Sequence, residues 1–323
     1  MTSPRSVTTA APRVSVVVPA FNCERYLGTA LESILAQSGP ALEIVVVDDG
    51  STDGTPDVAQ HFVATAPPGT VSLHRQANCG SAAARNRGLA LTRGSLIAFL
   101  DADDVWLPDK LAVQLRFLAA HPHHGMVCSR WQVQHDDFDT TSIPSVDAAE
   151  CTPDLDGWLY PTLFLSCKVW TSTVVMRRSL ADAVGTFDTS LKRGQDYDYW
   201  LRASRLTRIA RLSCVTAIYR IHHQSVTRTP QKENYEYQVL RKNVQSGPHS
   251  DTHSGSLTRR VVRVRLSQAW RNYWFEHYQA GSFRYCFRGA LQMIRWTPWE
   301  AGAWVAAART AFIPLLRHSP RRS

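Results

Sequence analysis

Several common sequence features are missing from this chain of 323 residues, and each absence excludes a class of protein. The seven cysteines are dispersed and form no C-x-x-C pair, which argues against a zinc site or a disulfide framework and favours reduced thiols in a cytosolic compartment. No uninterrupted apolar stretch reaches membrane-spanning length, so we expect no transmembrane helix. Residues 1–12 lack an apolar h-region, and we interpret them as a flexible tail instead of a signal peptide.

The glycine motifs that usually bind phosphate are also missing. No G-x-G-x-x-G follows the first predicted strand, and no G-K-[ST] loop occurs. An ordinary dinucleotide site or P-loop is therefore not expected.

Acidic side chains are scarce in the last quarter of the chain. Residues 241–323 contain 14 Lys/Arg and 3 Asp/Glu, whereas the first 240 residues contain 22 basic and 24 acidic side chains. A linker-like stretch at 243–250 separates the two parts. We therefore expect a near-neutral domain over 13–240, followed by a basic, aromatic, helical extension over 251–323.

The remaining composition suits a folded protein. Hydrophobic residues make up 44% of the chain, and ten of its residues are tryptophan, which is enough for a substantial core. Short apolar runs alternate with helical patterns, beginning with strands at 14–18, 43–47 and 95–100. This order predicts an α/β fold, with a mostly parallel sheet flanked by helices and a C-terminal helical extension.

Two acidic clusters follow strands of the predicted sheet directly. Asp48 and Asp49 come after the strand at 43–47, and Asp101, Asp103 and Asp104 come after the strand at 95–100. Open α/β sheets bind ligands at the carboxyl ends of their strands. Because neighbouring carboxylates repel one another, two such clusters indicate a site that binds a cation or hydrogen-bond donors.

Six motifs in a fixed order resemble the family 2 glycosyltransferases. They are Val14–Asn22 (VSVVVPAFN), Val47–Asp53 (VDDGSTD), Ala84–Gly88 (ARNRG), Phe99–Asp104 (FLDADD), Gly185–Asp188 with Gln195–Arg202 (GTFD, QDYDYWLR) and Tyr219–His222 (YRIH). The resemblance covers residues 14 to about 225 and implies the A-type glycosyltransferase fold, with a nucleotide-sugar half at 13–105 and an acceptor and base half at 106–240.

The resemblance implies a donor site for a nucleoside-diphosphate sugar. Pro19, Phe21 and Asn22 would line the base pocket, and Asp49 would accept a hydrogen bond from the base. Arg85 would reach the base or the diphosphate, unless it is a surface helix cation. Asp48 and Asp53 are better explained as turn or cap residues.

A divalent cation, Mg²⁺ or Mn²⁺, is implied by the D-x-D pair. Phosphate oxygens bind such ions together with one or two carboxylates. We assign Asp103 to the metal and Asp101 to the ribose, the metal or both, whereas Asp104 is either a further ligand or a supporting residue. His222 is a second candidate metal ligand, with a surface histidine as the alternative.

Asp196 is the candidate catalytic base, because it occupies the position of the base in the family motif. The usual preceding glutamate is Gln195 here, which puts an accessory acidic role in doubt. Asp196 and Asp198 have an alternative role as carboxylates that favour a helix N-terminus. Trp158, Tyr160, Trp170, Tyr197 and Trp200 either offer apolar faces to a sugar acceptor or belong to the core.

Together these residues predict an inverting, metal-dependent glycosyltransferase of surface polysaccharide or glycolipid assembly. The acceptor would be a glycan or a lipid-linked glycan, and the basic extension either contacts an anionic membrane or packs on the catalytic domain. We expect a cytoplasmic protein, peripheral on the membrane if the extension binds lipid. The alternative is a non-catalytic nucleotide-sugar-binding protein of the same fold. Nucleic-acid binding is not expected, because the body offers no basic groove or recognisable motif.

Overall fold

The computed structural model describes residues 14–39, 42–135, 146, 151–222, 230–246, 250–251 and 255–316. These residues form two compact units. One contains the described residues up to Leu159 together with Lys168–Ser190 and Arg202–His222. The other contains Tyr160–Cys167, Leu191–Leu201 and the described residues from 230 onward.

The first half of the sheet is parallel and matches the predicted strands. Its strands lie in the order β3-β2-β1-β4, so that Val16 of β1 lies between Ile44 of β2 and Ala98 of β4. Long apolar runs form these strands because both faces of the sheet are covered. The strands are β1 (Val14–Ala20), β2 (Leu42–Asp48), β3 (Val71–Arg75) and β4 (Leu96–Phe99).

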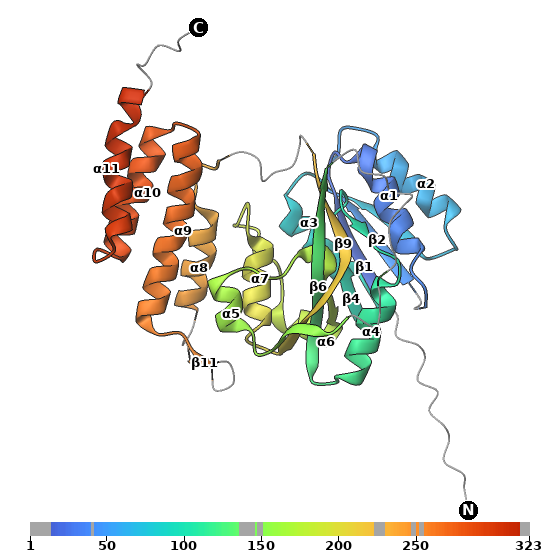
Figure 1. Ribbon diagram of the computed structural model, residues 1–323. Coiled ribbons are helices and arrows are strands. Elements are labelled where there is room, and N and C mark those ends of the chain that lie inside the picture. Colours follow the sequence, from blue (N-terminus) through green and yellow to red (C-terminus); the bar gives the residue numbers. More distant parts are fainter. Residues whose placement is uncertain are drawn as a thin grey trace, which may run out of the picture. The chain divides into compact units, whose positions relative to one another are not determined.

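Three helices cover the two faces of this half (Figure 1). They are α1 (Glu24–Leu35), α2 (Thr55–Thr65) and α3 (Ser81–Leu91). Side chains alternate along a strand, so Val14, Val16 and Val18 of β1 pack with α1, while Val45 and Val47 of β2 pack with Ala84 of α3.

The second half of the sheet contains antiparallel strands. Strand β8 (Val175–Arg177) lies between β4 and β6 (His124–His135) and is antiparallel to both. Strand β9 (Arg208–Ile221) runs parallel to β6, whereas β5 (Val105–Trp106) and β7 (Pro153–Gly157) run antiparallel to β9. The predicted α/β class is confirmed, and its parallel character belongs mainly to the first four strands. Helices α4 (Lys110–Ala120) and α6 (Arg178–Val184) and the short helix η2 (Thr171–Thr173) complete this unit.

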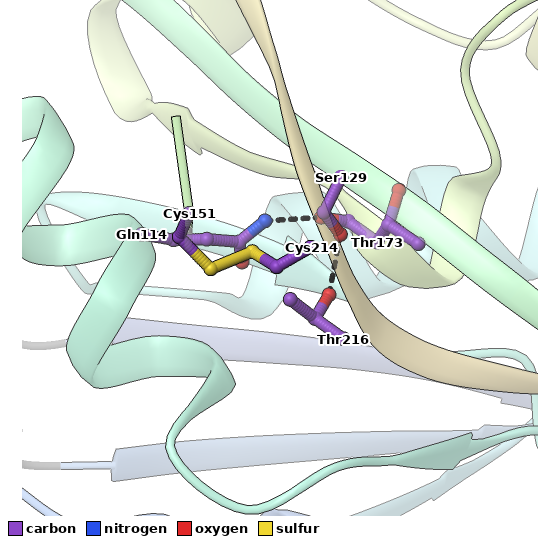
Figure 2. The surroundings of a disulfide bond; sticks show 6 residues. All are labelled: Gln114, Ser129, Cys151, Thr173, Cys214 and Thr216. Carbon is purple, nitrogen blue, oxygen red and sulfur yellow. Dashed lines mark hydrogen bonds between the residues drawn. A yellow bond between two sulfur atoms is a disulfide. The ribbon is translucent and has the colours of Figure 1, made fainter. Parts of the chain in front are cut away.

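The expectation that all cysteines are reduced is wrong for one pair. Cys151, just before β7, and Cys214, in β9, form a disulfide with their Cα atoms 5.0 Å apart (Figure 2). The two residues are 63 positions apart in sequence, and only the antiparallel pairing of β7 with β9 brings them together. Because that pairing leaves no trace in cysteine spacing, the sequence did not reveal it.

The second unit is helical. It contains α5 (Tyr160–Leu165), most of α7 (Gln195–Ala203), α8 (Tyr235–Gln245), α9 (Arg259–Gln279), α10 (Phe283–Trp296) and α11 (Ala301–Leu316), with a small β10–β11 pair (Ser250–Asp251, Gly255–Ser256). The predicted C-terminal helices are confirmed. Trp270 and Trp274 of α9 pack with Cys286 and Met293 of α10 and with Ala303 of α11. None of the helices traced here is both long and apolar enough to cross a membrane.

Candidate active site

The carboxyl ends of β1, β2 and β4 meet at one edge of the sheet, because these strands are parallel neighbours. Pro19 lies near the end of β1, and Phe21 and Asn22 follow that strand. Asp49 directly follows β2, and Asp101 lies two residues beyond the end of β4. The predicted donor-site residues therefore gather at this edge.

The turn after β1 is held against the turn after β2. Asn22 has a positive φ of 48°, which asparagine tolerates better than most residues. Its backbone N–H donates to Ser51 Oγ at 2.9 Å, and its Oδ1 accepts from Thr52 N at 2.9 Å. Phe21 beside it is exposed, so its ring is open to a ligand at this edge.

Asp49 is buried and organises the loop that leads into α3. Its Oδ1 accepts from Gln76 Nε2 at 2.7 Å and Cys79 N at 3.0 Å, and its Oδ2 accepts from Gly80 N at 2.7 Å. A carboxylate has about four acceptor positions, so these three bonds leave room for one more donor. Asp49 can accept this fourth hydrogen bond, the one predicted from a base, in addition to its supporting role.

Asp48 and Asp53 act within turns, as the sequence suggested. Asp48 Oδ1 accepts from Ser51 N at 3.1 Å, and its Oδ2 pairs with Arg75 Nε at 3.0 Å. Asp53 Oδ1 accepts from Thr55 N at 3.1 Å, at the start of α2. Both carboxylates are therefore engaged by the backbone of their own turn.

Arg85 is buried at this edge, so the alternative of a surface helix cation does not hold. Only 5% of Arg85 is exposed, and its Nη2 lies 2.6 Å from Asp101 Oδ1. The guanidinium also lies over the ring of Phe187, 5.7 Å from its centroid. Arg85 therefore orients Asp101, the first carboxylate of the D-x-D pair.

Asp103 and His222 lie side by side, although 119 residues separate them in sequence. His222 Nε2 is 3.0 Å from Asp103 Oδ2, and its ring packs on that of Tyr26 with 4.7 Å between centroids. Arg220 donates from Nε to the Asp103 backbone oxygen at 3.0 Å and also packs on Tyr26. The ring of Tyr26 on α1 thus supports both residues that contact Asp103.

Asp104 is a buried supporting residue. It accepts from Ser172 Oγ at 2.5 Å and Trp170 Nε1 at 2.9 Å through Oδ2, and from Arg220 N at 3.2 Å through Oδ1. Burial, reinforced by the charges of Asp103 and Asp101, raises the pKa of Asp104 well above its ordinary value. This burial removes Asp104 from the candidate metal ligands.

The residues at this edge fit a divalent cation that binds together with a nucleotide. Among the described residues there is no group of three or more His, Cys, Asp or Glu side chains that would enclose a metal by itself. Asp101 and Asp103 are 26% and 33% exposed at their side chains, which leaves them accessible to a ligand. One or two carboxylates with phosphate and water oxygens is the usual Mg²⁺ environment beside a nucleotide. His222 adds a nitrogen donor that suits Mn²⁺.

Asp196 lies in the first turn of α7, in the helical unit. Its Oδ1 accepts from Tyr197 N at 2.8 Å. Asp198, the other carboxylate of this turn, is fully buried and bound by Lys242 Nζ and Asn243 Nδ2, each at 3.0 Å. Asp198 therefore joins α7 to α8 and is a poor candidate for a base.

The structure separates the candidate acceptor aromatics into two groups. Tyr160, Tyr197 and Trp200 are buried, and the Tyr197 hydroxyl donates to Leu163 O at 2.7 Å, so these three belong to the core. Trp158 and Trp170 are partly exposed. Sequence reasoning missed Tyr26 and Ser172, since nothing in their local pattern sets them apart from ordinary core residues.

A family model for glycosyl transferase family 2 matches residues 15–179, which is half of the chain and contains the D-x-D pair and Arg85. The chain belongs to glycosyl transferase family 2. Like the rest of this family, it is a glycosyltransferase, as the sequence predicted. One relative is TuaG of Bacillus subtilis (strain 168), a glycosyltransferase whose name refers to teichuronic acid biosynthesis. It is 42% identical over 107 residues, which cover 33% of this chain and 42% of TuaG.

Two solved structures share the fold of this chain. S. aureus TarS 1-349 in complex with UDP-GlcNAc superposes with a TM-score of 0.64 at 18% identity, covering 96% of this chain and 93% of that one. The mannosyltransferase PcManGT from Pyrobaculum calidifontis, in complex with GDP-Man and Mn²⁺, gives a TM-score of 0.59 at 20% identity. That match covers 95% of this chain and 86% of PcManGT. The predicted A-type glycosyltransferase fold is therefore confirmed.

Proposed function

We propose that this family 2 glycosyltransferase is inverting and metal dependent, and that it moves a sugar from a nucleoside-diphosphate sugar to an acceptor hydroxyl. The observation that carries the proposal is the group of Asp101, Asp103, His222 and Arg85 at the carboxyl edge of the sheet. Two accessible carboxylates, a histidine and a buried arginine provide the charges that a metal–diphosphate leaving group needs.

In this proposal the donor is held by residues of the sheet unit. Pro19, Phe21 and Asn22 line the base pocket, and Asp49 accepts from the base. Arg85 and Asp101 face the ribose and the diphosphate. Asp103 and His222 hold Mg²⁺ or Mn²⁺, and Asp101 is the third candidate ligand. Such a cation offsets the negative charge that develops on a departing diphosphate.

Asp196 takes the proton of the acceptor hydroxyl. An alcohol becomes a good nucleophile only as its proton is removed, and a carboxylate within hydrogen-bond reach performs this step. The alternative role for Asp196 is that of a carboxylate that only favours the N-terminus of α7.

The acceptor we propose is a glycan or a lipid-linked glycan at a membrane surface. Support comes from the name of the relative TuaG and from the outer face of α10, where Phe283, Phe287 and Leu291 are 44%, 51% and 49% exposed. These residues recur every four positions and therefore form one apolar stripe. Arg284 and Arg295 are exposed beside this stripe. An apolar stripe bordered by arginines suits an anionic bilayer.

Calorimetric titration with UDP and GDP, with Mn²⁺ or with a chelator, tests the donor site. We expect binding that needs the cation and is lost in Asp103→Ala. The matched control is Asp182→Ala, which removes an exposed carboxylate on α6 of the same unit. Equal affinity with cation and with chelator would rule out the metal role.

Asp196→Asn tests whether Asp196 is the catalytic base. The amide keeps the size of the carboxylate but cannot accept the proton, so turnover should fall by about two to four orders of magnitude. Nucleoside-diphosphate affinity should stay unchanged. Wild-type turnover in this variant, with chemistry rate-limiting, would show that Asp196 is not the base.

Sedimentation with vesicles of phosphatidylserine and phosphatidylcholine tests the membrane surface. Replacing Phe283 and Phe287 with serine should release the protein from the vesicles, whereas Leu206→Ser, at an exposed residue of the sheet unit, should not. If the wild-type protein fails to sediment at low salt, the membrane contact is wrong.

A further inference from the structure

Three partly exposed aromatic rings form a cluster beside the D-x-D segment. Trp131 and Trp170 stack with 5.6 Å between ring centroids and 26° between ring planes. Trp170 also packs against Tyr219, with centroids 4.3 Å apart. All three residues belong to the sheet unit, and each is partly exposed.

Strand register and one hydrogen bond bring these rings together. Trp131 of β6 pairs with Ala217 of β9, and Val133 pairs with Tyr219 two residues further along. Trp170 precedes η2, and its indole N–H donates to Asp104 Oδ2 at 2.9 Å. Because Asp104 adjoins Asp103 in the chain, the cluster is tied directly to the segment that holds the proposed metal ligand.

The three rings of this cluster are more exposed than the aromatic side chains that only fill the core of the sheet unit. The aromatic side chains that fill the core of this unit, such as Trp106, Phe99 and Phe187, have less than 2% of their surface exposed. Trp131, Trp170 and Tyr219 retain accessible surface, and Val133 near them is 49% exposed. Partly exposed indole and phenol rings lose unfavourable contact with water when an apolar surface covers them.

The C–H face of a pyranose ring is such a surface. Its hydroxyl groups project from the ring edge and stay hydrated or hydrogen-bonded, while its C–H groups pack on an aromatic ring. Ligand sites commonly combine aromatic walls with a few polar groups that fix orientation. The Trp170 indole N–H is already bonded to Asp104, so this ring is held in one orientation before a sugar arrives.

We propose that Trp131, Trp170 and Tyr219 form an aromatic platform that binds a pyranose ring next to the diphosphate site. The inference rests on the proposed function, since it adds a sugar subsite to the donor site of the same unit. The ring belongs either to the donor sugar or to the acceptor glycan. Both present the same C–H face, so the experiment has one arm for each source.

The acceptor arm uses free hexoses with the donor site filled. Saturation-transfer NMR is recorded with glucose, mannose and N-acetylglucosamine in the presence of saturating UDP or GDP and Mn²⁺. The wild-type protein should transfer saturation to hexose ring protons, and Trp131→Ala should lose this transfer. Trp131→Phe should retain it, because a phenyl ring still offers an apolar face. Trp304→Ala is the matched control, since Trp304 is 55% exposed on α11 in the helical unit.

The donor arm compares calorimetric affinities of UDP with UDP-GlcNAc and of GDP with GDP-Man. If the platform holds the donor sugar, Trp131→Ala weakens the sugar nucleotide by roughly twofold to tenfold, the range expected for one aromatic contact. The affinity for the nucleoside diphosphate itself stays unchanged. That unchanged affinity also shows that the variant is folded.

Loss in either arm supports the platform and identifies the source of the ring. If Trp131→Ala and Trp170→Phe both match wild type in both arms, the platform is wrong, while intact nucleoside-diphosphate binding leaves the proposed function standing. If wild type transfers no saturation to any hexose and binds each sugar nucleotide no more tightly than its diphosphate, the platform is also wrong. Failure of wild type to bind any nucleoside diphosphate would overturn the proposed function itself.

Discussion

At Gly88 the backbone of α3 lies directly against β1. A Cβ atom at this position would overlap Val17 Cγ1 and would come within 3.3 Å of Val17 Cγ2. Glycine therefore permits the close approach that lets Arg85, one turn earlier on α3, reach Asp101. The glycine of the A-R-N-R-G motif is a requirement of packing, and its effect on the site is indirect.

Gly88→Ala should destabilise the protein by about 1–3 kcal/mol, because an added methyl group in a close-packed interface forces the helix away from the strand. Gly28→Ala is the matched control within a helix. Its Cβ would meet Phe62 and Val58 at 3.9 Å, which is ordinary contact, so this variant should gain up to about 1 kcal/mol from helix propensity. Urea denaturation of both variants checks the pair, and equal stability changes would contradict the packing argument.

At the level of single residues, the sequence predicted the residues that face the proposed ligand better than the residues that hold them in place. The D-x-D pair, Arg85 and His222 carry motif spacings, and the structure brings each of them to this edge. Tyr26 and Trp131 belong to no motif of this kind. They reach the site through ring contacts with His222 and Trp170, which are distant in sequence. Asp104 was ambiguous for the same reason, since its partners Trp170, Ser172 and Arg220 are all remote in sequence.

At the scale of elements, β7 is attached to β9 by charge as well as by backbone pairing. Asp154 of β7 forms two hydrogen bonds with Arg211 of β9, at 2.8 and 2.9 Å, and lies 2.7 Å from Arg130 Nη2 of β6. Burial alone would raise the pKa of Asp154, but hydrogen bonds and charge from Arg211 and Arg130 outweigh it and hold the pKa below its ordinary 3.8. The ionised carboxylate is therefore the form that stabilises the fold.

Asp154→Asn should lower the free energy of unfolding by about 1–3 kcal/mol at pH 7, the range for hydrogen bonds to charged groups. A carboxylate with a lowered pKa in the folded state stabilises at pH values above its unfolded pKa. This contribution disappears as the pH falls through the folded pKa. The difference between wild type and variant should thus shrink below about pH 4. Denaturation curves at pH 7, 4 and 3 measure it, and a difference that stays constant with pH would contradict the assignment.

Long apolar strands were predictable and short edge strands were not. The runs at 14–18, 43–47 and 95–100 coincide with β1, β2 and β4, since buried strands need continuous apolar residues. Strand β7 reads Pro-Asp-Leu-Asp-Gly, a composition typical of a turn, and forms a strand only because β9 provides its partners. Strand β8 has only three residues, which are too few to show the alternation of apolar and polar side chains that identifies a strand.

At the scale of the whole molecule, the basic extension uses many of its charges internally. Arg265 is buried and pairs with Glu236 at 2.5 Å, while Arg271 pairs with Glu300 and Arg288 with Glu233. Arg263 packs over the ring of Trp299. The sequence revealed the excess of positive charge but not which arginines are paired, because each acidic partner is 29 or more residues away from its arginine in sequence. Arg259, Arg260, Arg284 and Arg295 are exposed and remain candidates for an anionic surface.

The disulfide Cys151–Cys214 should contribute about 2–4 kcal/mol, because it closes a long loop in the unfolded chain. Replacing both cysteines with alanine should lower the urea midpoint. Adding dithiothreitol to the wild-type protein should lower the midpoint to the same extent as the double substitution. Cys79→Ala, at an exposed free thiol, should leave the midpoint unchanged. Thiol titration of the denatured, unreduced chain should give five free thiols. A count of seven would show that the bond does not form.

Neither compact unit is a single continuous stretch of the chain, and this limits which truncations and domain exchanges leave both units intact. The backbone changes unit after Leu159, Cys167, Ser190, Leu201 and His222. The turn that carries Asp196 depends on late residues: Lys242 and Asn243 bind Asp198, and Arg265 Nε donates to Phe164 O at 3.0 Å. A protein cut at residue 222 would keep its nucleotide edge but lose the support of its proposed base. Recombination between relatives could not exchange the helical unit as one cassette, since three separate segments would have to move together.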